Sequence, residues 1–107
     1  MAARARVHGP AGVSAVPGTT LHRALFYDYV ENVVERRAPY RAAHLELFGA
    51  WRADGRIVMG GAVGDPPHGA LIVFRGDADV EEFVRADPYV ANGIVTGRRV
   101  EPWAVVD

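Results

Sequence analysis

The residues that could perform chemistry in this sequence are few, and they centre on one histidine. His44 lies in residues 38–51, a stretch that predicts an amphipathic helix with Pro39 in its first turn. Four other residues share its helix face through three- and four-residue spacing: Tyr40, Leu47, Phe48 and Trp51. A histidine on such a face is either a hydrogen-bonded core residue or a working group beside a cleft. Because an imidazole titrates at about 6.5 when unperturbed, the working alternative is proton transfer near neutral pH.

Two further residues could complete a site around His44. Asp87 precedes Pro88 at the end of a predicted helix, where its carboxylate serves either as a cap or turn residue or as the hydrogen-bond partner that orients an imidazole. Arg41 lies one helical turn before His44. Its guanidinium is either a clamp for an anionic substrate oxygen or the ion-pair partner of a carboxylate such as Asp87.

Other familiar catalytic motifs are absent. The chain has no cysteine, which excludes thiolate chemistry and disulfides, and its one serine, Ser14, lies near the N-terminus. The four histidines, at positions 8, 22, 44 and 68, do not show the spacing of metal ligands. The glycines at 60, 61, 64 and 69 form no phosphate-binding loop. We therefore expect neither a metal nor a cofactor.

The composition bounds the class of protein. A chain of 107 residues with half of them hydrophobic predicts one globular domain. The net charge of −1 offers no electrostatic reason to bind nucleic acid, and no apolar run is long enough to span a bilayer. Residues 1–20 show no sustained period and predict a flexible N-terminal extension, which leaves residues 21–107 as the domain. With no good signal peptide, we expect a cytoplasmic location.

The remaining segments predict the elements that position these side chains. Residues 21–30, 57–63, 70–74 and 97–106 have the composition of strands, and residues 39–54 and 80–86 that of helices. We expect the two middle strands to be packed on both faces. The order β-α-β-β-α-β predicts an α+β fold, the ferredoxin-like sandwich, with a four-stranded antiparallel sheet and both helices on one face.

That fold leaves one apolar sheet face uncovered. A patch of this kind exceeds what monomers usually expose, so we expect a homodimer that covers it.

We expect the pair His44–Asp87 to lie within hydrogen-bond reach at the mouth of a pocket. Three residues of the predicted strands are candidates to line this pocket and bind a small-molecule substrate: Tyr27, Met59 and Trp103.

These residues also form a recognisable pattern. It reads Arg37-x-x-x-Arg41-x-x-His44-Leu45, then glycines at 60 and 61, then Ala86-Asp87-Pro88-Tyr89-Val90, and finally Val100-x-Pro102-Trp103. The pattern resembles the YciI-like (YCII-related) family over residues 21–106. The combination of R-x-x-H-L with A-D-P-Y is more specific than either motif alone.

The resemblance implies a dimeric ferredoxin-like fold of the dimeric α/β-barrel type, with His44 and Asp87 as the active-site pair in a cleft beside the sheet. The best-understood members of the family resemble dehydrochlorinases that act on chlorinated hydroxyquinol-type rings, so the resemblance implies elimination chemistry by analogy. This sequence differs from the short members in its leader and in its compact loop at residues 64–69. These differences leave the substrate open.

We therefore expect a cofactor-free lyase or isomerase, similar to a dehydrochlorinase or dehydratase, that acts on a small cyclic substrate. His44 would remove a proton next to a carbonyl, Asp87 would orient the imidazole, and Arg41 would stabilise the enolate. Two alternatives stay open. One is a non-catalytic small-molecule binding or accessory protein, and the other is oxygen- or haem-linked chemistry, as in related dimeric α/β-barrel proteins.

Overall fold

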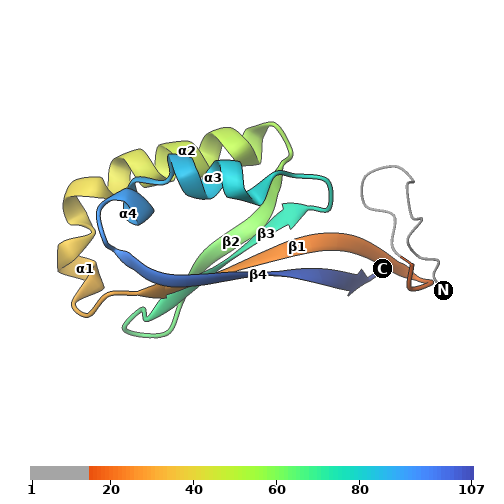
Figure 1. Ribbon diagram of the computed structural model, residues 1–107, viewed down its shortest axis with the longest axis horizontal. Coiled ribbons are helices and arrows are strands. Elements are labelled where there is room, and N and C mark those ends of the chain that lie inside the picture. The colour runs from red at the N-terminus through yellow and green to blue at the C-terminus, as the bar shows by residue number, and fades with distance from the viewer. Residues whose placement is uncertain (1–14) are drawn as a thin grey trace.

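The computed structural model describes residues 15–107; residues 1–14, most of the expected N-terminal extension, lie outside the described residues. The described chain forms one four-stranded sheet with its helices on one face (Figure 1). In chain order the elements are β1 (Thr19–Tyr29), α1 (Val33–Arg36), the 3₁₀ helix η2 (Ala38–Tyr40), α2 (Arg41–Ala53), β2 (Ile57–Val63), β3 (Gly69–Arg75), α3 (Val80–Ala86), α4 (Pro88–Ala91) and β4 (Val95–Val106).

The sheet has the strand order β2-β3-β1-β4, and each neighbouring pair is antiparallel. This is the arrangement of the ferredoxin-like fold, so the predicted fold class is confirmed. The central strand β1 pairs with β3 on one side and with β4 on the other. Tyr27, for example, lies opposite Ala70 of β3 and Arg98 of β4. The middle of β1 is therefore held from both sides beneath the helical layer.

The helix α2 carries the predicted stripe into the core. His44 and Trp51 are buried, while Leu47 and Phe48 are partly buried. The helix ends before Gly55, whose φ of 85° is a left-handed conformation that glycine adopts at little cost. Although α2 is the longest helix, nothing in residues 15–107 is a helix long and apolar enough to cross a lipid bilayer.

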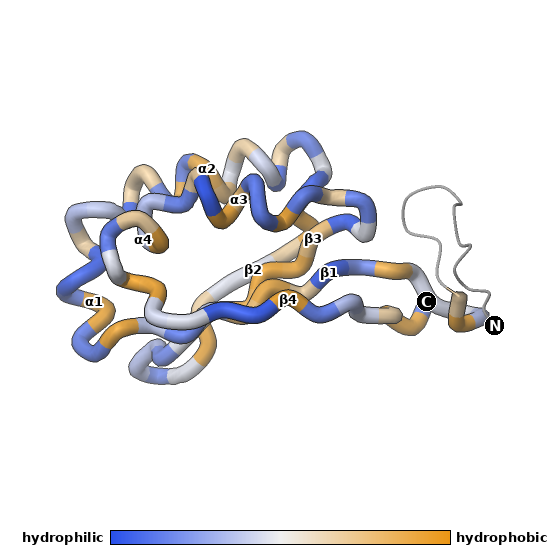
Figure 2. The backbone as a smooth tube through the Cα atoms, viewed as in Figure 1, coloured by the Kyte–Doolittle hydropathy of each residue, from blue (hydrophilic) through white to orange (hydrophobic). Residues whose placement is uncertain are grey.

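Three aromatic rings anchor the helices to the sheet. Trp51 of α2, Phe74 of β3 and Phe83 of α3 contact one another edge to face, with ring centroids 5.3 to 5.9 Å apart. Such pairs contribute about 0.5–1.5 kcal/mol each beyond the burial of their area. In Figure 2 the hydrophobic colours concentrate along the strands beneath the helices, and the helical turns alternate between hydrophobic and hydrophilic residues. The core therefore lies between the two layers.

The opposite face of the sheet bears no helix in the described part of the chain (Figure 1). Its apolar side chains come from all four strands: Ala24, Phe26, Met59, Leu71, Val73 and Trp103. The expectation that residues 57–63 pack on both faces is wrong for this chain, because β2 is an edge strand in which only Ile57 is buried. The residues of β3 agree better with that expectation, since five of its seven are buried.

Five strand boundaries differ from the predicted ones, and the two largest differences, of two residues each, are at the starts of the first and last strands. The first strand begins at Thr19 rather than Leu21, and the last begins at Val95 rather than Gly97. Both extra segments are paired: Thr19 lies opposite Val106 and Tyr29 lies opposite Val95. Residues 19 and 20 are therefore part of the sheet.

Candidate active site

The side chains of His44 and Asp87 meet beneath the helical layer. His44 Nδ1 lies 2.8 Å from Asp87 Oδ1, and only 7% of His44 and none of Asp87 is exposed. The two residues come from different elements: His44 from the first turn of α2, and Asp87 from the junction between α3 and α4. The predicted contact between the two side chains is present, whereas the role of the pair in catalysis is a proposal taken up below.

Asp87 accepts three hydrogen bonds. Besides His44, the backbone N–H of Tyr89 donates to Oδ1 over 2.9 Å, and the Tyr27 hydroxyl donates to Oδ2 over 2.8 Å. The bond from Tyr89 is an N-cap interaction, because Asp87 precedes Pro88 at the first position of α4. The alternatives of cap and histidine partner are thus not exclusive: Asp87 is both at once.

This network determines which imidazole nitrogen is free. Two donors, the Tyr27 O–H and the Tyr89 N–H, already point at the carboxylate of Asp87, which as a carboxylate has no proton to give. The hydrogen between the Asp87 carboxylate and His44 therefore belongs to Nδ1, which assigns the tautomer of an uncharged imidazole. Nε2 keeps its lone pair and can accept a proton.

The ring of His44 is also held from one side. Tyr89 stacks on it with ring centroids 3.8 Å apart and planes within 3° of parallel. Tyr89 itself is 1% exposed, so its ring is packed in the interior. The hydrogen bond fixes rotation of the imidazole in its plane, and the stack fixes the plane.

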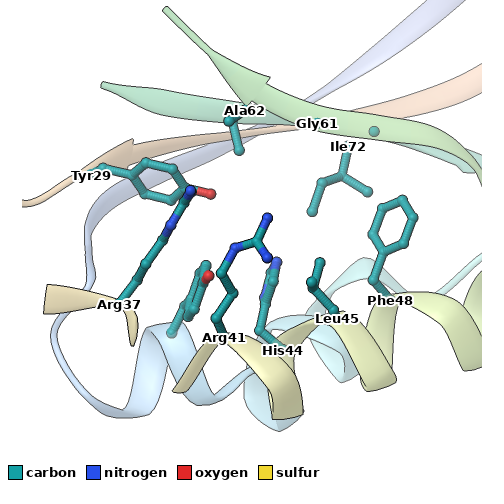
Figure 3. A pocket seen from close by; sticks show the side chains of 12 residues that line it. Tyr29, Arg37, Arg41, His44, Leu45, Phe48, Gly61, Ala62 and Ile72 are labelled. Carbon is teal, nitrogen blue, oxygen red and sulfur yellow. The ribbon is translucent and has the colours of Figure 1, made fainter. Parts of the chain in front are cut away.

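A cavity of about 150 Å³ opens beside His44, between the helical layer and strands β2 and β3 (Figure 3). This volume is comparable to that of an apolar cavity that admits benzene, about 150 Å³. Its apolar wall is made by Leu45, Phe48, Ala62, Ala70 and Ile72, and its polar wall by Tyr29, Arg37, Arg41, His44 and Tyr89. The cavity therefore suits a small ring with polar substituents.

Gly60 allows the wall of the cavity to close. A Cβ atom on Gly60 would lie 2.9 Å from Cε2 of Phe48 and 3.2 Å from the Cα of Ile72. The absence of a side chain thus lets α2 approach β2. Gly60 is thus a site of close backbone approach, and the register shift of β2 lies earlier, between Ile57 and Met59.

Arg41 points into the cavity from the start of α2, near the free edge of the His44 ring (Figure 3). Within residues 15–107 no carboxylate forms an ion pair with it, and Asp87 is occupied by other donors. Of the two alternatives for Arg41, the ion pair with Asp87 is therefore absent. A position suited to an anionic substrate oxygen remains.

The phenol groups around the site are kept protonated. Burial, with the nearby Tyr89 and Asp87 adding to it, raises the pKa of Tyr29 to about 12, although the guanidinium groups of Arg37 and Arg41 oppose the shift. Burial also raises the pKa of Tyr27, reinforced by the charge of Asp87 and the hydrogen bond to it, and burial raises the pKa of Tyr89. Near neutral pH these hydroxyls can donate hydrogen bonds but cannot act as bases.

The three strand residues expected to line the pocket do not line this cavity. Tyr27 is 3% exposed and lies behind the pair, where its hydroxyl contacts Asp87. Met59 and Trp103 lie on the open face of the sheet and are 58% and 42% exposed. Met59 is on that face because the register shift after Ile57 reverses the alternation of β2. Trp103 lies opposite His22 of β1, which is two residues from Ala24 and so shares its face of the sheet. Trp103 therefore lies on the open face as well.

Of the twelve lining residues, only Arg41 and His44 were singled out as site residues. Those that were missed include Tyr29, Arg37, Leu45 and Phe48. Signals for these four residues were available in the sequence. Tyr29 shares a strand face with Tyr27, Arg37 opens the family pattern, and Phe48 belongs to the stripe of His44. Leu45 is 45% exposed and lies outside the helix stripe, but it follows His44 in the family pattern.

No set of three or more histidine, cysteine or acidic side chains is gathered in a way that could hold a metal ion among residues 15–107. What the arrangement offers is a histidine with one free nitrogen, an arginine beside it, and an apolar wall opposite. Chemically, these groups can move a proton and stabilise a negative oxygen.

Comparison with known proteins agrees with this fold. The solved structure of 5-chloro-2-hydroxyhydroquinone dehydrochlorinase (TftG) from Burkholderia phenoliruptrix AC1100, in complex with 2,5-dihydroxybenzoquinone, is similar, with a TM-score of 0.64 and 22% sequence identity. The alignment covers 77% of this chain and 92% of that chain. No match is found among curated proteins. Residues 22–104 match the model of the YCII-related domain, and the chain therefore belongs to the YCII-related family.

Proposed function

We propose that this protein is a small-molecule lyase or isomerase that works without a cofactor, using His44 and Asp87 as an acid/base pair on a small cyclic substrate. The observation that carries the proposal is the hydrogen bond of 2.8 Å between His44 and the buried Asp87 at the edge of a mostly apolar cavity. The similarity to the fold of a dehydrochlorinase supports elimination as the reaction class.

The proposed reaction begins with a proton transfer. Nε2 of His44 removes a proton from a ring carbon next to a carbonyl, and the electron pair moves onto the carbonyl oxygen as an enolate. Arg41 stabilises this oxygen, and Asp87 stabilises the imidazolium that has formed. Chloride or hydroxide then leaves the adjacent carbon as the enolate collapses, with the imidazolium supplying the proton that hydroxide needs to leave as water. The net change is loss of HCl or water, so no electrons need an external acceptor.

For an isomerisation, the same groups return the proton to a different carbon. The imidazolium is then the acid, and no leaving group is needed. The geometry supports both outcomes because the step that involves the protein, removal of a proton next to a carbonyl, is the same in each.

A second candidate is a protein that binds the ring without transforming it. The feature that favours it is the small volume of the cavity, about 150 Å³. We rank catalysis first, because pure binding does not require a histidine that is oriented by both a buried carboxylate and a stacked ring.

We further propose that the protein acts as a homodimer through the open face of the sheet. The support is the apolar character of that face, where Met59 and Trp103 are largely exposed in the single chain. The cytoplasmic location expected from the sequence stays a prediction.

The test is a turnover assay of the purified protein on two substrate types, 5-chloro-2-hydroxyhydroquinone and cyclic β-hydroxyketones, with and without a metal chelator. The proposal predicts loss of chloride or water that the chelator does not affect. Activity that requires haem, flavin or a metal would contradict the mechanism. Tight binding of the ring with no product would favour the binding protein.

A further inference from the structure

Arg37 is the one described residue with a buried side-chain nitrogen or oxygen that has no hydrogen-bond partner, and the atom is its Nε. Within residues 15–107 its guanidinium forms neither an ion pair nor a side-chain hydrogen bond. A buried donor without an acceptor costs about 1–3 kcal/mol. The position of Arg37 therefore costs free energy that no hydrogen bond or ion pair within residues 15–107 offsets.

The side chain of Arg37 points into the cavity that contains His44 (Figure 3). It reaches this cavity from the junction between α1 and η2, four residues before Arg41. In the close-up, the guanidinium of Arg41 is drawn over the edge of the His44 ring, and that of Arg37 is drawn over Tyr29. The charge of Arg37 lowers the pKa of Tyr29 more than the charge of Arg41 does, which agrees with this arrangement. The two positive charges thus enter the same small space at different places.

The described residues that line the cavity do not balance its charge. Its lining includes two guanidinium groups but no aspartate or glutamate from residues 15–107. The nearby carboxylate, Asp87, is 0% exposed behind His44 and accepts three hydrogen bonds already. The phenols of Tyr29 and Tyr89 stay protonated near neutral pH, because burial raises the pKa of each. The cavity therefore carries a net positive charge that a ligand has to balance.

We propose that Arg37 is a substrate-binding residue that selects cyclic substrates with a second anionic oxygen, remote from the carbon that His44 deprotonates. This inference rests on the proposed function and extends it to a substrate class: rings with ionised oxygens at two separated positions. Arg41 takes the oxygen of the reacting carbonyl, and Arg37, with the Tyr29 hydroxyl beside it, takes the other. The guanidinium of Arg37 lines the cavity and has no ion-pair partner within residues 15–107, and the anion supplies that partner.

The test measures binding rather than turnover. The probe is 2,5-dihydroxybenzoquinone, whose acidic hydroxyls give an anion at two separated ring positions at neutral pH. The comparison ligand is hydroquinone, which has phenol groups with a pKa of about 10 and so remains neutral. Dissociation constants are measured by calorimetry for the wild-type protein and for Arg37→Gln, Arg37→Lys and the matched control Arg36→Gln, which removes the same charge from an exposed neighbour.

We expect Arg37→Gln to raise the Kd of the probe about 10- to 100-fold, the effect of losing one charge-assisted hydrogen bond. Arg37→Lys should recover only part of this loss, because a lysine keeps the charge but not the planar fork. Arg36→Gln should leave the Kd unchanged, and hydroquinone should bind more weakly than the probe to the wild-type protein. The melting temperature of Arg37→Gln should not fall, since no ion pair or side-chain hydrogen bond within residues 15–107 is lost, and this separates a binding role from a structural one.

The inference is overturned if Arg37→Gln leaves the Kd of the probe within about twofold, or if the probe and hydroquinone bind the wild-type protein equally. These outcomes are distinct from failure of the proposed function. A protein that binds the probe through Arg37 but turns over no substrate contradicts the catalytic proposal alone. A protein whose turnover needs His44 but whose binding ignores Arg37 contradicts only the present inference.

Discussion

Tyr27 and His44 donate hydrogen bonds to different oxygens of the same buried carboxylate, that of Asp87, each over 2.8 Å. The strand β1 and the helix α2 are thereby joined through one residue at the α3–α4 junction. Because the carboxylate is 0% exposed, water cannot replace either donor. The contact that orients the histidine therefore also holds three elements of the fold together.

The first prediction concerns the stability of this junction. Asp87→Ala leaves the donors of His44, Tyr27 and Tyr89 without their acceptor, so it should lower the free energy of unfolding by about 3–5 kcal/mol. Asp87→Asn keeps one acceptor oxygen and should cost less, about 1–3 kcal/mol. Urea denaturation followed by circular dichroism measures both values.

A matched control for this experiment is Asp79→Ala. Asp79 also caps a helix, through a hydrogen bond to the backbone of Glu82, but it is exposed. Its loss should cost about 1 kcal/mol, the ordinary value of a cap. If Asp87→Ala lowers the free energy of unfolding no more than Asp79→Ala does, Asp87 contributes only as a helix cap. The hydrogen bonds from His44 and Tyr27 would then not hold the three elements together.

The second prediction is loss of stability at alkaline pH. Tyr27, Tyr29 and Tyr89 have raised pKa values in the folded protein, about 12 for Tyr29. Above about pH 10 the unfolded chain releases phenol protons that the folded chain retains, so the unfolded state binds fewer protons and stability falls as pH rises. The stabilisation is complete below about pH 10 and is lost as the pH rises through the folded-state values.

The alkaline titration reports on the phenol groups, because the sequence contains no lysine and no cysteine, the other side chains that titrate in that range. Unfolding free energies from about pH 9 to about pH 11.5 should show the decline, and Tyr29→Phe should make it shallower. Phenolate absorbance should appear later in the folded than in the urea-unfolded protein. Coincident titration curves for the two states would show that the phenols are not shielded.

The third prediction concerns the wall of the cavity. Gly60→Ala places a methyl group 2.9 Å from Phe48, so it should destabilise the protein by about 1–3 kcal/mol and weaken ring binding. Gly61→Ala is the paired control, because a Cβ atom there meets nothing within 4 Å. Thermal unfolding of the two variants measures the difference. Equal effects of both substitutions would mean that Gly60 is not a site of close approach.

Much of this arrangement could be predicted from the sequence. The helix stripe identified His44 as inward-facing, and the position of Asp87 before Pro88 identified it as a cap or partner. It was harder to predict which face of the sheet each strand residue lies on. Because β2 is apolar at nearly every position, its sequence does not show which residues face the helices and which face the open side. The register shift after Ile57 then moves Met59 to the open face. A local shift of this kind depends on pairing with β3, which a single sequence does not reveal.

The fourth prediction tests the proposed dimer. Trp103→Glu places a charge on the apolar open face and should convert the protein to monomers, while Val34→Glu, at an exposed apolar position of α1, should not. Analytical ultracentrifugation at micromolar concentration distinguishes the two states. A wild-type protein that is already monomeric under these conditions would contradict the proposal.

The most direct test of the central claim is the rate of product formation by His44→Gln relative to the wild-type protein, on the substrate that the wild type turns over. Glutamine keeps a donor that can face Asp87 but cannot accept the substrate proton, so the rate should fall about 10²- to 10⁴-fold while the Kd for the ring changes little. His68→Gln, a change to an exposed histidine outside the cavity, should leave the rate unaltered. A His44→Gln protein that forms product at the wild-type rate would contradict the assignment of His44 as the catalytic base.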